Sequence, residues 1–119
     1  ILSLAELKVS SNWSVTFMKG ILCNWFVRLS LWQASWGNSV IDKAIGIFLP
    51  ISGFVTMGLE HCVANMYIIL QGMILGANVT IIDFIVNNLI PVTLGNIISG
   101  VLFVGVTSYI FFHANSYNL

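Results

Sequence analysis

Charged side chains are scarce in this chain of 119 residues: Lys and Arg together number four, as do Asp and Glu, so the formal net charge is zero. They make up 7% of the residues, whereas a soluble domain uses about 25% to cover its surface. Hydrophobic residues make up 58%, and the mean hydropathy is +0.97. This composition excludes a water-facing exterior and predicts an integral membrane protein. Without a basic excess, we expect no nucleic-acid partner.

Motifs of enzymatic chemistry are also missing. The sequence has no nucleophile elbow, phosphate-binding loop, dinucleotide fingerprint or set of His and Cys at metal-ligand spacing. We therefore expect no enzymatic activity, no metal and no cofactor. Cys23 and Cys62 lie in apolar segments, where a thiol behaves as a small hydrophobic group, and we favour free thiols over a disulfide. No signal peptide is visible, and we expect residues to be missing before Ile1.

Apolar runs are what the chain does have. About 20 apolar residues span a bilayer as a helix, and we expect such helices at 17–36 and 91–113. Pro91 suits the first turn of the second helix, with Asn87 or Asn88 as its N-cap. We expect a connecting segment at residues 1–16, a re-entrant or surface segment at 79–90 and a polar tail at 114–119.

The run 44–77 is too long for one straight span and too short for two. Glu60 and His61 lie at its middle, where a charged residue costs about 2.5–3.5 kcal/mol by insertion scales. Such residues are kept when they pair or when they line a polar path. Because Gly53 and Gly58 weaken the helix just before this pair, we favour a broken helix over one long tilted helix.

A helix continuing through His61 would place Phe54, His61 and Asn65 on one face. In the functional interpretation, Phe54 is a hydrophobic constriction and His61 exchanges a proton. In the structural interpretation, a neighbouring helix satisfies His61 and Phe54 only packs. Both interpretations remain open from the residues alone. We expect Glu60 to have a structural role, accepting backbone N–H groups at the helix break rather than relaying protons.

Asparagines place one amide in or near each span, at Asn24, Asn65 and Asn96. These amides either tie helices together or supply neutral donors along an anion path. Arg28 follows Asn24 by four residues, near the centre of the first span. It has several candidate roles: pairing with Glu60, snorkelling, contacting a subunit, or acting as a fixed cation in the conduit.

Three strings closely resemble motifs of the formate/nitrite transporter family: GILCNW (Gly20–Trp25), GLEHCVANM (Gly58–Met66) and NNLIPVTLGN (Asn87–Asn96). They stand in the order and spacing of that family's fourth, fifth and sixth membrane helices, over about Lys8 to His113. The resemblance implies an all-α membrane protein with an aquaporin-like helical bundle. This chain would be one three-helix inverted repeat with a broken middle helix, and the first half would be missing.

The resemblance also implies a function. Such proteins carry small monovalent weak-acid anions (formate, nitrite, hydrosulfide or lactate) through a pore in each protomer of a homopentamer. The membrane would be the cell's inner or plasma membrane. By the same resemblance, His61 is the central pore histidine, Phe54 an aromatic of a constriction and Asn24 a pore-lining amide. Asn65 and Asn96 match family asparagines near the ends of the broken helices.

The first motif departs from the family pattern Cys-Asn-x-Leu-Val-Cys-Leu-Ala-Val-Trp, since Phe26, Arg28 and Ser30 stand at three of its places. Arg28 replaces a small thiol there, which puts ordinary packing or selectivity in doubt at that point.

The function we expect is passage of a weak-acid anion, with the proton as second partner and His61 exchanging it. An aquaporin-type channel for neutral solutes is one alternative, since it needs no titratable residue. The other alternative is a structural membrane subunit, in which Glu60 and His61 only brace helices.

Overall fold

The computed structural model describes residues 1–106, 108–110 and 113. Over these residues the chain is helical, without strands, as predicted. The helices are α1 (Leu2–Ser10), α2 (Trp13–Trp36), α3 (Val40–Thr56), α4 (Cys62–Ile74), α5 (Ile81–Asp83), η1 (Phe84–Leu89), α6 (Ile90–Ser99) and η2 (Gly100–Val106). The predicted tail at 114–119 lies outside the described residues.

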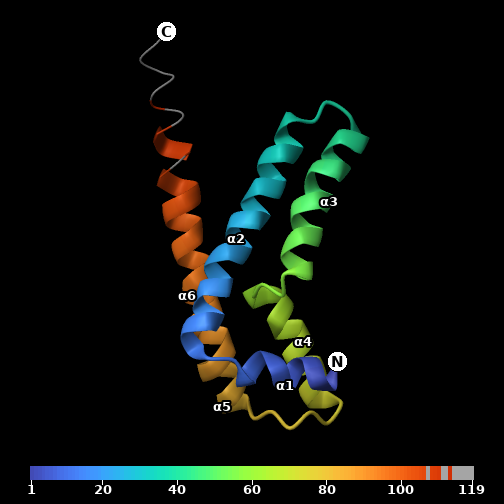
Figure 1. The fold of residues 1–119 in the computed structure, drawn as a ribbon, viewed down its shortest axis with the longest axis vertical. Helices are drawn as coiled ribbons and strands as arrows, with labels where there is room; N and C mark the ends of the chain where they lie inside the picture. Colours follow the sequence, from blue (N-terminus) through green and yellow to red (C-terminus); the bar gives the residue numbers. More distant parts are fainter. Residues whose placement is uncertain (107, 111–112, 114–119) are drawn as a thin grey trace.

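The helices form an open arrangement (Figure 1). α2 and α3 make an antiparallel hairpin, and α6 packs along the first half of α2. α1 lies across α4 at the end opposite the α2–α3 turn. Where α4 meets η1, a small core forms from Ile69, Val79 and Phe84. This core holds α4 against the start of the last helix.

The predicted connecting segment 1–16 differs from the structure, because it contains α1 and the first residues of α2. α2 begins at Trp13 rather than at residue 17 and ends at Trp36, as expected. The signal was Asn12, whose side-chain Oδ1 accepts hydrogen bonds from the backbone N–H of Ser14 at 3.0 Å and from its hydroxyl at 2.8 Å. The Asn12 side chain thus gives a hydrogen-bond acceptor to a backbone N–H of the first turn that has none within the helix, and it fixes where the helix starts.

The middle helix is broken, as predicted. α3 ends at Thr56 and α4 begins at Cys62, with the non-helical residues 57–61 between them. Gly58 has φ of +61°, a left-handed backbone conformation that glycine adopts without steric cost. The break therefore coincides with the Glu60–His61 pair.

The prediction for residues 79–90 is wrong. The chain enters a helix at Ile81 and continues through α5, η1, α6 and η2 without a re-entrant turn. Thr80 caps this helix instead of Asn87 or Asn88: its Oγ1 accepts from the Asp83 N–H at 3.1 Å, while Asp83 Oδ2 accepts from the Thr80 N–H at 3.2 Å. Among the described helices, Ile81–Ile110 is the one long and apolar enough to cross a membrane.

Pro91 consequently lies inside this long helix rather than at its start. Proline lacks the N–H that would bond to the preceding turn, and its ring crowds that turn. The turn before it, η1, is a π-helix, whose wider winding accommodates such an interruption. The polar residues that suggested a surface segment are used within the fold, since Asn88 is fully buried.

A capping box starts α3 at the outer end of the hairpin. Ser39 Oγ accepts from the Asp42 N–H at 3.1 Å, and Asp42 Oδ2 accepts from the Ser39 N–H at 3.0 Å. The Ser39 side chain, followed by the Ser39 and Asn38 backbone N–H groups, holds the pKa of Asp42 below its usual value. A depressed carboxyl pKa stabilises the fold fully above the ordinary pKa of Asp, and this contribution is lost as pH falls through the depressed pKa.

We expect Ser39→Ala to raise the pKa of Asp42 towards its ordinary value, because the variant removes the main cause of the shift. A carbon-13 NMR titration of the Asp42 carboxyl group in detergent micelles measures this change. Asp83, in the separate capping box with Thr80, is the internal control and should titrate as in the unmodified protein. An Asp42 pKa that is the same in both proteins would contradict the expectation.

Candidate functional site

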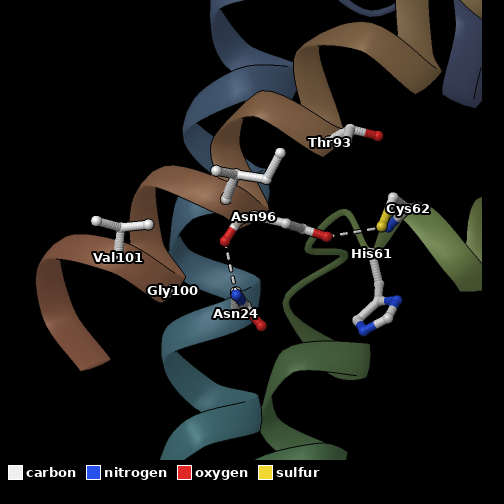
Figure 2. Close-up of a pocket in the computed structure, with 8 residues that line it drawn as sticks. Asn24, His61, Cys62, Thr93, Asn96, Gly100 and Val101 are labelled. Carbon is white, nitrogen blue, oxygen red and sulfur yellow. Dashed lines mark hydrogen bonds between the residues drawn. The ribbon is translucent and has the colours of Figure 1, made fainter. Parts of the chain in front are cut away.

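A pocket of about 460 Å³ lies beside the helix break, between α2, the start of α4 and the junction of α6 with η2. Figure 2 shows the side chains that line it. The lining residues are Asn24, His61, Cys62, Thr93, Asn96, Ile97, Gly100 and Val101. The structure therefore brings together three of the predicted site residues, Asn24, His61 and Asn96.

Asn96 is the centre of the polar contacts at this pocket. Its Nδ2 donates to the carbonyl oxygens of Gly20 at 2.7 Å and of Glu60 at 3.3 Å. Its Oδ1 accepts from the backbone N–H of Cys62 at 3.2 Å. The Cys62 N–H lies in the first turn of α4, where backbone N–H groups have no acceptor within the helix. One buried amide thus ties α2, the break and the start of α4 together.

Asn24 faces Asn96 from α2. Its Nδ2 donates to the backbone carbonyl of Asn96 at 2.6 Å, joining residues 72 positions apart in the sequence. Figure 2 shows this bond as a dashed line between the two side-by-side helices. The two asparagines therefore line the pocket and tie helices together, and the Asn96 Nδ2 group already donates to two backbone carbonyls. Their role as donors to an anion stays a prediction.

His61 is the N-cap of α4 and has an extended backbone, with φ of −116° and ψ of 120°. Its Nδ1 accepts from the Ala64 N–H at 3.5 Å, a long hydrogen bond. An accepting Nδ1 in a neutral imidazole assigns the ring proton to Nε2. Within the described part of the chain Nε2 has no hydrogen-bond partner, and the ring is only partly buried. His61 is thus placed to donate to a molecule in the pocket.

The helical face expected for Phe54, His61 and Asn65 does not form, because residues 57–61 are not helical. Phe54 still contacts His61: the ring centroids are 6.4 Å apart and the planes differ by 30°. Phe54 does not line the pocket itself. Asn65 does not line the pocket either, and it is 1% exposed. Its assignment to the pore face is therefore not supported by the geometry.

Asn65 belongs to a second buried group of polar side chains, which we call the clamp: Lys8, Glu60, Asn65 and Asn88. Lys8 Nζ lies 2.8 Å from Glu60 Oε2, and Asn65 Nδ2 also donates to this oxygen. Asn65 Nδ2 donates to Asn88 Oδ1 at 2.9 Å, and Asn88 Nδ2 donates to the Lys8 carbonyl at 3.0 Å. The clamp connects α1, the break, α4 and η1.

The clamp corrects the expected role of Glu60 and removes one of the candidate roles of Arg28. The Glu60 carboxylate accepts from the side chains of Lys8 and Asn65 rather than from backbone N–H groups at the break. Arg28 does not pair with Glu60; its Nη2 lies 3.4 Å from Ser108 Oγ. The need for a counterion to Glu60 was visible in the sequence, but the choice between Lys8 and Arg28 depended on the position of α1.

Sequence reasoning also missed Thr93 and Cys62 as lining residues of the pocket. Thr93 precedes Asn96 by three residues, so a helix places both on one face. That spacing could have identified Thr93. Cys62 was considered only as a thiol, and both it and Cys23 are free.

Comparison with known proteins gives a consistent assignment. The family model described as Formate/nitrite transporter matches residues 1–110. The formate channel FocA of Haemophilus influenzae is 40% identical over 124 residues, covering 89% of this chain and 44% of the relative. The probable formate transporter of Methanothermobacter thermautotrophicus is 47% identical over 95 residues, covering 80% of this chain and 34% of the relative. This chain thus spans less than half the length of these relatives.

Two solved structures share the fold. One is described as a pentameric formate channel with formate bound, with a TM-score of 0.78 and 30% identity over 93% of this chain and 51% of that chain. The other, an FNT family ion channel, has a TM-score of 0.78 and 35% identity over 91% of this chain and 43% of that chain. They confirm the predicted all-α membrane fold. By sequence and by structure, this chain belongs to the formate/nitrite transporter family.

Proposed function

We propose that this chain forms part of a transmembrane pathway for small monovalent weak-acid anions, and that His61 exchanges a proton with the anion in the pocket. The observation that carries the proposal is the convergence of an imidazole with the Asn24 and Asn96 amides in a pocket at a helix break. Formate, nitrite, hydrosulfide and lactate are the substrate class. The protein acts as a channel or transporter rather than as an enzyme.

The physical problem is desolvation of the anion. Moving a bare charge from water into an apolar medium costs tens of kcal/mol by ideal solvation arguments. The walls formed by Ile97 and Val101 offer no polar group in exchange. The N-terminal end of α4, which begins at Cys62, carries a partial positive charge that favours an anion in the pocket. The pocket can therefore attract the anion, but an apolar passage beyond it admits a neutral molecule more readily.

His61 supplies the missing proton. Protonation of Nδ1 releases the long bond from the Ala64 N–H and gives the charged ring. The charged ring then donates its Nε2 proton to the bound anion, which gives the neutral weak acid and a neutral imidazole protonated at Nδ1. Nε2 recovers a proton from water before the next anion binds. The acid passes Phe54, which stacks beside the ring and forms the apolar constriction in this proposal. On the other side the acid releases the proton to water. With an ordinary pKa of about 6.5, imidazole is suited to such exchange at mild acidity.

The complete pathway needs more helices than this chain contributes. It spans 44% of the Haemophilus influenzae formate channel, and one related structure is a pentamer. We propose that an inverted three-helix repeat completes each pore wall and that five protomers assemble in the cell's inner or plasma membrane. Many large apolar side chains exposed on this chain, including Phe48, Ile74 and Ile82, would face lipid or these other helices.

The test is His61→Phe in the protein that carries these residues, reconstituted into liposomes. We expect formate uptake driven by an inward proton gradient to be abolished, because phenylalanine keeps a ring but cannot exchange a proton. Uptake of labelled formate at several external pH values measures this effect. The matched control is His113→Phe, since His113 lies outside the pocket with its ring 4.3 Å from that of Tyr109.

Other results would contradict the proposal. Undiminished pH-dependent uptake in His61→Phe would reject the role of His61. Solute flux insensitive to pH and to competing anions would favour a neutral-solute channel. Absence of flux in the complete assembly would support a purely structural subunit.

A further inference from the structure

Arg28 lies one helical turn beyond Asn24 on α2, so both side chains project from the same face of the helix. Asn24 lines the pocket, and so do Gly100 and Val101 at the start of η2. In Figure 1, α2 and the last helix run in the same direction. Residues that follow Asn24 and residues that follow Gly100 therefore lie towards the same side of the pocket.

Contacts between α2 and the last helix agree with this placement. Trp25 stacks on Phe103 with ring centroids 5.5 Å apart. Arg28 Nη2 lies 3.4 Å from Ser108 Oγ. The guanidinium group is therefore held between these two helices, on the side of the pocket where α2 ends.

No carboxylate neutralises Arg28 within the described residues. Glu60 is bound to Lys8 at 2.8 Å. The other three acidic side chains bind groups elsewhere: Glu6 accepts from the Asn78 N–H, and Asp42 and Asp83 each cap the start of a helix. The hydrogen-bond partner of Arg28, Ser108 Oγ, is a neutral hydroxyl at the long distance of 3.4 Å. A guanidinium group has five N–H donors in a planar fork, so most of them are available to a ligand.

We propose that Arg28 is a specificity-determining residue that attracts the anion beside the pocket and favours planar anions with two oxygens. The inference rests on the proposed function, since it assigns substrate selection to the same pathway. A guanidinium group binds a carboxylate through two parallel N–H···O bonds. Formate and nitrite present two oxygens in this way, whereas hydrosulfide presents a single atom. A lysine at this position would attract all three but would lack the fork.

The retention of a cation in an apolar helix supports this role, because such a residue is costly unless it is used. Arg28 places one positive charge between α2 and the last helix, on the side of the pocket described above. In a partly wet environment, a unit charge near an anion's path alters the anion's occupancy there by about threefold to thirtyfold.

The experiment compares Arg28→Gln and Arg28→Lys in liposomes, measuring the half-saturation concentration for formate and for hydrosulfide. For Arg28→Gln we expect an increase of about threefold to tenfold for both anions, larger at low ionic strength. For Arg28→Lys we expect hydrosulfide to be little affected while formate still weakens by about threefold or more. The formate-to-hydrosulfide preference should thus fall in both variants, because both lack the fork, whereas hydrosulfide binding should weaken in Arg28→Gln alone, because only that variant loses the charge.

Lys43→Gln is the matched control, because it removes one exposed positive charge at the start of α3, away from the pocket. Its half-saturation concentrations should equal those of the unmodified protein. If Arg28 only packs between helices, the variants will lower the amount of folded protein or the maximal rate without changing half-saturation or preference. That result overturns the inference.

The outcome is separable from that of the proposed function. Proton-linked formate uptake that is lost in His61→Phe, together with unchanged half-saturation in both Arg28 variants, rejects the role of Arg28 alone. Absence of anion uptake by the unmodified protein rejects the proposed function. If Arg28→Gln does not insert into the membrane, the preference measured in Arg28→Lys decides the inference.

Discussion

Glu60→Gln and Lys8→Met should each destabilise the protein by about 3–5 kcal/mol, because either change leaves one buried charge of the clamp without its counterion. The side chains of Lys8 and Glu60 are 11% and 6% exposed, and their charged atoms are 2.8 Å apart. Water can therefore do little to replace the lost partner. The effect should appear as a lower midpoint of unfolding when the protein in mixed micelles is titrated with a denaturing detergent.

The double variant tests the cause. Lys8→Met combined with Glu60→Gln removes both charges and should recover much of the stability that either single change loses. Glu6→Gln is the matched control: Glu6 is exposed on the same helix as Lys8, and its replacement should change stability by about 0.5 kcal/mol or less. Single variants as stable as the unmodified protein would show that the pair is not a buried counterion pair.

Gly95→Ala should separate α2 from α6 and collapse the pocket. A Cβ atom at Gly95 would lie 2.4 Å from the carbonyl oxygen of Phe17 and 3.0 Å from the backbone nitrogen of Ile21. Both atoms belong to the backbone of α2, so no side-chain rotation relieves the overlap. Overpacking commonly lowers the free energy of unfolding by about 1–3 kcal/mol. Because the Cβ of Gly95→Ala would collide with backbone atoms, we expect a loss at the upper end of this range or beyond.

Gly20, on α2, lies in the same close contact between α2 and α6, since a Cβ there would lie 2.9 Å from the carbonyl oxygen of Val92. Separation of the two helices would also lengthen the bonds of Asn96 to Gly20 and of Asn24 to Asn96. We expect loss of both thermal stability in detergent and anion flux in liposomes. Gly105→Ala is the control, because the nearest atom to a Cβ there is 3.8 Å away. Equal behaviour of the two alanine variants would contradict the packing argument.

The helix break could be predicted because its causes are local. A polar pair in an apolar run and the nearby Gly58 are visible in the sequence, and the structure places the break there. Motif resemblance identified Asn24, His61 and Asn96, which do meet at one pocket. The resemblance also predicted the channel fold that two solved structures share.

The errors concern residues whose partners are distant in the sequence. Asn87 and Asn88 indicated a surface segment, yet Asn88 is buried because Asn65 and the Lys8 carbonyl satisfy its amide. Asn65 was assigned to the pore because a helix through His61 would place it one turn further on the same face. Residues 57–61 are not helical, and the Asn65 amide instead binds Glu60 and Asn88 in the clamp.

The order in which the chain is synthesised bears on how the Lys8–Glu60 pair is inserted into the membrane. The two residues are 52 positions apart, and the ribosome makes α1 first. When Glu60 enters the bilayer, the ammonium group that neutralises it has already been synthesised. A carboxylate arriving before its counterion would face lipid alone and would oppose insertion. The helix α1 thus supplies the counterion of Glu60 before Glu60 itself is inserted.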